Sequence, residues 1–135
     1  MIANDLRRIG KLYISVLGQH LPPPHSEFMA ETLLLVARKK TPVTVGQLIA
    51  HLENDKRTII KSLNELISLG YVEVKQASAV RIDDQLILTP IGRNLLPYIE
   101  EALMIIEKKI ADTSEEIDLN LFNSLLRKLE ANLRK

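Results

Sequence analysis

Hydrophobic residues recur every three or four positions along most of the chain, which is the spacing of helices with one buried face. The first such segment covers residues 5–20, and Asn4 or Asp5 can cap its start. Three prolines at 22–24 must end this helix, because proline lacks the amide proton that a helix interior needs.

The same spacing predicts three further helices before residue 70. Ser26 is placed to cap a helix over residues 27–40. A short helix follows over 44–52, and another begins near Asp55 and ends at Gly70, which favours a left-handed C-terminal cap. Two short helices joined by so tight a turn match a helix-turn-helix.

Residues 71–76 and 84–89 alternate as strands do and predict a β-hairpin. Thr89–Pro90 is a strong helix start, and the helix that it opens should run to about Ile110.

A last helix is expected after a capping-box pair, Thr113 and Glu116. One side of it carries an apolar stripe of Phe122, Leu125, Leu126, Leu129 and Leu133. The pattern predicts a mainly α protein with a small β-hairpin, and residues 1–135 form one domain without repeats or a long linker.

Composition excludes several classes of protein. The chain has no cysteine, which rules out disulfide scaffolds, thiolate zinc sites and thiol-based redox sensing, and favours a reducing cytoplasm. No apolar run approaches the roughly 18 residues of a membrane span. The start, MIANDLRRIG, lacks the apolar core of a signal peptide. We therefore expect a cytoplasmic protein without a membrane partner.

Net charge is only +1, and residues 41–93 carry six basic and six acidic side chains. A nucleic-acid surface would therefore depend on where charges are placed rather than on their sum.

The helix that begins near Asp55 places its charges in a distinctive way. Arg57 and Lys61 lie four residues apart, opposite an apolar face formed by Ile59, Leu63 and Leu66. The exposed first half thus presents Arg57, Thr58 and Lys61 together, although cations there oppose the helix dipole. In a helix-turn-helix this half meets base edges in the major groove, where arginine can bind guanine with two hydrogen bonds.

Neighbouring residues extend this candidate surface. Contacts should end near Asn64, because Glu65 would repel phosphate. Lys56 is a candidate for the DNA backbone. Thr44 can hold a phosphate at a helix start or can serve as a cap alone.

The order of elements and two stretches, VTVGQLIAHLENDKRTIIKSLNELISLGYVEV and LILTPIGRNLL, resemble the MarR family of winged-helix transcriptional regulators. The resemblance implies a winged helix-turn-helix core over 26–93, flanked by dimerisation helices in 1–21 and 94–135. It also implies a homodimer that acts as a repressor on a pseudo-palindromic double-stranded DNA operator.

The wing departs from the family pattern. Family wings are commonly rich in arginine around an Asp-x-Arg element, whereas residues 77–84 carry one cation and two anions. By resemblance, Arg81 enters the minor groove, and Lys75 on the wing strand is a further candidate.

The terminal helices offer a second function. Their apolar side chains either pack within one chain or form a dimer interface, as the resemblance implies, through Leu6, Ile9, Leu12, Phe122, Leu125, Leu126 and Leu129. A two-fold dimer would place two recognition helices about 34 Å apart.

The resemblance also implies a small aromatic or anionic effector. Its pocket would be lined by Tyr13, Leu17, His20, His25 and Phe28. Two histidines without a third ligand make a poor metal site, and no cofactor is expected.

The sequence has no glycine-rich phosphate loop and no catalytic His-Glu-x-x-His or Gly-x-Ser-x-Gly motif, so we do not expect an enzyme. The alternative is a winged-helix module that binds protein. A protein-binding module does not require cations at positions 57 and 61, whereas a DNA-binding surface does require them. Arg57 and Lys61 therefore distinguish the two interpretations.

Overall fold

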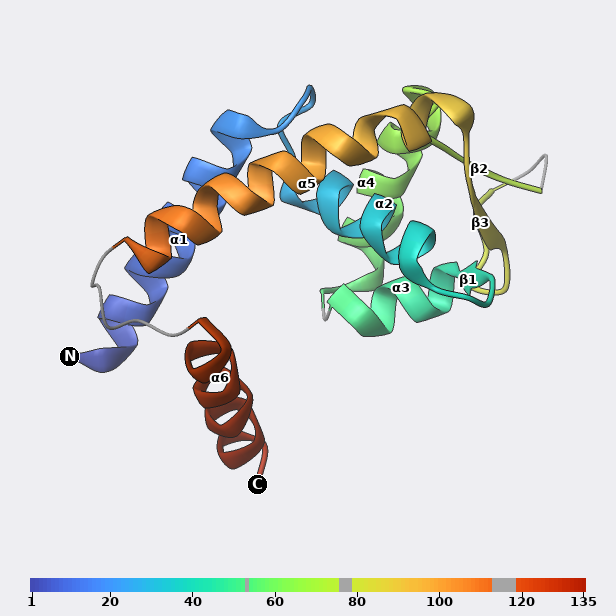
Figure 1. The fold of residues 1–135 in the computed structure, drawn as a ribbon. Helices are drawn as coiled ribbons and strands as arrows, with labels where there is room; N and C mark the ends of the chain where they lie inside the picture. The colour runs from blue at the N-terminus through green and yellow to red at the C-terminus, as the bar shows by residue number, and fades with distance from the viewer. Residues whose placement is uncertain (53, 76–78, 113–118) are drawn as a thin grey trace.

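The computed structural model describes residues 1–52, 54–75, 79–112 and 119–135 (Figure 1). The described chain is mostly helical, with three short strands in one antiparallel sheet. In chain order the elements are α1 (Ile2–His20), α2 (Glu27–Arg38), β1 (Val43–Thr44), α3 (Val45–Leu52), α4 (Lys56–Ser68), β2 (Val72–Val74), β3 (Gln85–Leu88), α5 (Pro90–Ala111) and α6 (Leu119–Leu133).

The sheet has the strand order β1-β3-β2, so it contains one strand more than the expected hairpin. The hairpin of β2 and β3 is confirmed by the pairing of Val72 with Leu88. The additional strand pairs Val43 with Leu86. Two residues are too few to show the alternation by which a strand is recognised in a sequence. Residue 76, expected at the end of the first hairpin strand, lies outside the described residues.

Two helix starts are capped as expected, by Ser26 and Thr89, and Asp55 caps the helix that was expected to begin near it. The side chains of Ser26, Asp55 and Thr89 accept hydrogen bonds from backbone N–H groups in the first turns of α2, α4 and α5. Gly70 has φ 78°, which confirms the left-handed end of α4.

The expected cap of α1 is wrong. This helix begins at Ile2 without a side-chain cap, and Asp5 lies inside it, paired with Arg8 at 2.7 Å. The Thr113–Glu116 capping box lies outside the described residues.

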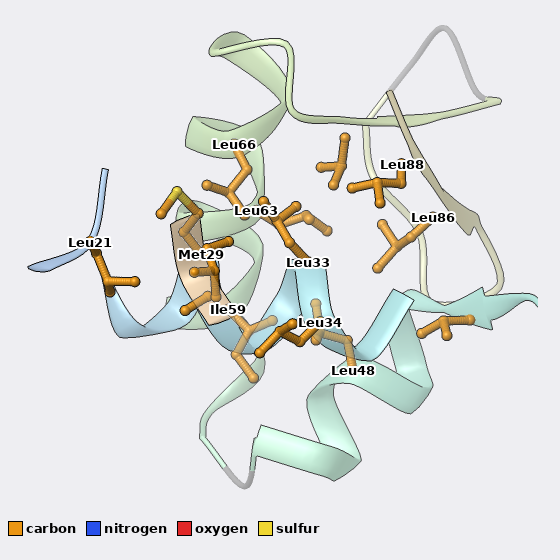
Figure 2. Packing of buried hydrophobic residues seen from close by; sticks show 14 of the residues in the cluster. Leu21, Met29, Leu33, Leu34, Leu48, Ile59, Leu63, Leu66, Leu86 and Leu88 are labelled. Atoms are coloured by element: carbon orange, nitrogen blue, oxygen red, sulfur yellow. The ribbon is translucent and has the colours of Figure 1, made fainter. Parts of the chain in front are cut away.

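The core lies between α2, α3, α4 and the sheet, as Figure 2 shows. Its fully buried side chains include Met29 and Leu33 of α2, Leu48 of α3 and Leu63 of α4. Long helix α5 adds Ile99 to this core and runs from the sheet towards α1 (Figure 1).

The terminal helices bury far less. In α1 only Leu17 is buried, and no described residue of α6 is. Figure 1 shows α6 standing apart from the helix-turn-helix, at the end of the molecule away from the wing.

Candidate nucleic-acid interface

The outer face of α4 is built as its pattern predicts. Ile59, Leu63 and Leu66 are at most 2% exposed and hold one side of the helix against the core. Arg57 and Lys61 are exposed on the other side. Neither forms an ion pair among the described residues, so both charges are available to a partner.

An anion at the start of α4 offsets the unfavourable position of these cations. The Asp55 carboxylate accepts hydrogen bonds from the Thr58 N–H and the Thr58 hydroxyl, at 2.8 and 2.7 Å. These bonds lower the pKa of Asp55 below its ordinary value, so the cap is ionised at neutral pH. The Thr58 hydroxyl proton is engaged in the cap, and its oxygen remains able to accept a hydrogen bond.

Thr44 acts as a cap in the structure. Its hydroxyl accepts the Gln47 N–H at 3.2 Å, and the Gln47 side-chain oxygen accepts the Thr44 N–H at 3.0 Å. This reciprocal pair is a capping box. It occupies the Thr44 amide and leaves the hydroxyl proton as the group that can reach a phosphate.

The remaining predicted contact residues are at the surface. Lys56 and Asn64 lie exposed on α4, and Lys75 and Arg81 lie exposed at the two ends of the segment that joins β2 to β3. Residues 77 and 78 of the expected wing tip lie outside the described residues.

The wing has one surface anion fewer than the sequence predicted, because Asp84 is buried. Its side chain is 6% exposed, and one carboxylate oxygen accepts the Arg81 N–H at 2.8 Å. Asp84 is therefore a buried turn residue and not a surface anion. Arg81 and Asp83 are the exposed charges of this turn.

A junction that the sequence did not predict ties the end of α4 to the start of α5 and to the loop between α1 and α2. At the start of α5, the Thr89 N–H donates to the Tyr71 carbonyl at 3.2 Å, and the Thr89 hydroxyl donates to the Gly70 carbonyl, its nearest acceptor, at 2.5 Å. The Tyr71 hydroxyl donates to the Pro23 carbonyl at 3.0 Å, in the loop between α1 and α2. A methyl group at Gly92 would overlap the Tyr71 carbonyl oxygen, so glycine permits this close packing.

The expected effector residues lie in several places in the structure. Leu17 is buried in the core, and Tyr13 is half-buried. The His25 ring nitrogen Nδ1 lies 2.7 Å from the Leu21 carbonyl oxygen. His20 lines a cavity of about 390 Å³ between α1 and α5, together with Gln19, Leu21, Pro22, Tyr98, Glu101, Ala102 and Ile105.

Phe28 lines a different cavity, of about 270 Å³, between α2 and the start of α4. Glu27 and Glu31 face this space with His51. Burial, and then a hydrogen bond with the Glu31 side chain and its charge, raise the pKa of Glu27 to about 7. Burial, followed by the charges of Glu27, Glu107 and Glu31, also raises the pKa of Tyr13.

No three histidine or carboxylate side chains in the described parts of the chain gather as metal ligands would. In the same parts, none of the helices is both long and apolar enough to cross a membrane.

The seven side chains expected at a dimer interface are all exposed in the single chain. Each is between 40% and 60% exposed: Leu6, Ile9, Leu12, Phe122, Leu125, Leu126 and Leu129. Intramolecular packing, the alternative for this apolar surface, therefore does not cover it.

Solved structures share this fold over nearly the whole chain. A probable transcriptional regulator from Pseudomonas aeruginosa matches with a TM-score of 0.80 at 18% identity, over 96% of both chains. MarR matches at 0.76 and 23% identity, over 99% of this chain and 98% of that one. BpsR of Bordetella bronchiseptica, whose DNA binding is regulated by 6-hydroxynicotinic acid, matches at 0.76 and 18% identity, over 96% and 93%.

The chain thus has the winged-helix fold of the MarR-family transcriptional regulators. Neither a protein-family model nor a curated protein matches the sequence.

Proposed function

We propose that this protein is a MarR-type transcriptional regulator that binds double-stranded DNA as a homodimer and represses transcription from a pseudo-palindromic operator. The observation that supports this most is the outer face of α4. Two cations without ion pairs among the described residues, Arg57 and Lys61, lie on the exposed side of the second helix of a helix-turn-helix.

In this proposal α4 lies in the major groove, with Arg57 and Lys61 towards base edges and Lys56 and Asn64 towards the backbone. Arg81 reaches the adjacent minor groove, while Thr44 and Lys75 contact phosphates. Residues 26–93 form the DNA-binding core.

The terminal segments, 1–21 and 94–135, form the dimer interface. The exposed apolar side chains of α1 and α6 support this assignment, because a second copy would remove them from water. A DNA partner also agrees with the cytoplasmic location expected from the sequence.

The proposed regulator also binds a small-molecule effector. We place its site at the cavity between α1 and α5, where His20 and Glu101 supply polar groups beside Tyr98. The loop beside this cavity, between α1 and α2, accepts a hydrogen bond from the Tyr71 hydroxyl at the Pro23 carbonyl. A ligand in the cavity would therefore contact the loop that holds Tyr71, just beyond the end of α4.

The test is fluorescence anisotropy on DNA from upstream of the protein's own gene, and then on fragments selected from the genome, across a salt series. Arg57→Ala/Lys61→Ala should weaken selective binding about a hundredfold and relax the preference for the operator sequence, since two base contacts are lost. Arg127→Ala/Lys128→Ala, on α6, removes the same charge and should leave both nearly unchanged. A protein-binding module would instead show weak binding without selectivity, equal in all three proteins.

A further inference from the structure

The turn from Arg81 to Asp84 is closed on itself. The Asp84 N–H donates to the Arg81 carbonyl at 3.1 Å, and the Asp84 carboxylate accepts the Arg81 N–H at 2.8 Å. Because Asp84 is 6% exposed, this second bond is shielded from water. Arg81 is thus anchored through its backbone, while its side chain remains exposed.

The same turn is bonded to the first residues of α3. The Val45 N–H donates to the Asp84 carbonyl, and the Gly46 N–H donates to the Ile82 carbonyl, both at 2.9 Å. Amides at a helix start have no partner inside the helix, so the turn satisfies groups that α3 cannot satisfy itself. A methyl group at Gly46 would lie 2.7 Å from Ile82 Cγ2, which shows how closely the two segments pack.

We infer that Asp84 is a positioning residue that holds Arg81 at a fixed place relative to α4. The clasp, defined as Val45, Gly46, Arg81, Ile82 and Asp84, joins the wing to α3, and α3 and α4 pack into the same core. The wing arginine and the recognition helix would then approach one duplex as a single preformed surface. Preorganisation of this kind avoids an ordering penalty when DNA binds.

This inference rests on the proposed DNA-binding function, and a double-mutant cycle tests it. Asp84→Ala should weaken operator binding about tenfold in the natural chain, but by less than about twofold in the Arg81→Ala background, because the arginine that it positions is gone. Asp84→Asn keeps an oxygen that can accept the Arg81 N–H and should retain most of the affinity.

Arg57→Ala/Lys61→Ala provides the control. The operator affinity lost through this double substitution should be the same with and without Asp84. The inference is overturned if Asp84→Ala has no effect on affinity, or if it loses the same affinity whether or not Arg81 is present. The latter result would show that Asp84 acts only through general stability.

A second measurement does not depend on DNA. Amide hydrogen exchange of the free protein should show slow exchange at Arg81, Val45 and Gly46, made at least about tenfold faster by Asp84→Ala, with α4 unchanged. Equal exchange in both proteins would refute the clasp. If no operator binds but the clasp is detected, the proposed function fails while the structural basis of the inference stands.

Discussion

Helices α4 and α6 have the same kind of apolar stripe but very different surroundings. In α4, Ile59, Leu63 and Leu66 are almost completely buried by α2, α3 and the sheet. In α6, Leu125 and Leu129 are 55% and 42% exposed. The winged helix-turn-helix therefore contains its own packing partners, whereas the stripe of α6 stays open among the described residues.

This difference separates two uses of amphipathicity. A stripe that is covered within the chain fixes the shape of the surface that we propose faces DNA. A stripe left open is unfavourable in water by about 25 cal/mol for each Å² that a partner could cover, and it favours association. The two regions should respond differently to mutation, and the predictions below follow from that.

The largest effect is expected from a charge on the open stripe. Leu129→Asp should weaken dimerisation a hundredfold or more, because association would bury an unpaired carboxylate. Ala131→Asp adds the same charge on the opposite, exposed face of α6 and should leave dimerisation nearly unchanged. Sedimentation equilibrium measures both. Equal association of the two variants would contradict the proposed interface, and unchanged circular dichroism serves as the folding control.

A smaller effect, confined to folding stability, is expected at the junction of α4 and α5. Gly92→Ala should lower the free energy of unfolding by about 2–4 kcal/mol, because its methyl group would overlap the Tyr71 carbonyl. Gly10→Ala is the matched control in α1, where an added methyl group meets nothing within 4 Å. It should raise stability by up to about 1 kcal/mol, since alanine favours helix. Urea denaturation that finds the two changes equal would contradict the packing.

The smallest effect concerns pH and the cavity beside α4. The pKa of Glu27 is raised to about 7 in the folded protein, mainly by burial, from an ordinary value of 4.5. The folded state thus holds this proton more tightly, so stability should fall as pH rises from about 4.5 to 7. With allowance for solvent screening at this half-buried group, the fall is roughly 1–2 kcal/mol.

Glu27→Gln has no side-chain charge to titrate and should flatten this part of the profile. The measurement is urea unfolding at several pH values from 4 to about 8. An identical slope in both proteins would show that Glu27 does not cause the pH dependence.

Features governed by local chemistry could be predicted from the sequence. Asp55, Gly70 and Thr89 define helix ends through their own side chains or backbone freedom, and the structure confirms all three. The apolar face of α4 follows from helix geometry alone, which is why the exposure of Arg57 and Lys61 could also be predicted.

Features that depend on distant partners could not be predicted. Strand β1 exists because Val43 meets Leu86, far along the chain. Asp84 looked like a surface anion because its neighbours in sequence are polar, but its burial is set by α3. The Tyr71–Pro23 hydrogen bond spans 48 residues, and no local pattern marks it.

The most direct test of the central claim is the mass of the protein, free and on operator DNA, by analytical ultracentrifugation. We expect a free particle of two 15.3 kDa chains and a complex with two chains for each duplex containing both half-sites. We also expect Leu129→Asp to shift the free protein to one chain and to abolish tight binding. A stable 15.3 kDa monomer that binds a single half-site as tightly as the full operator would contradict it.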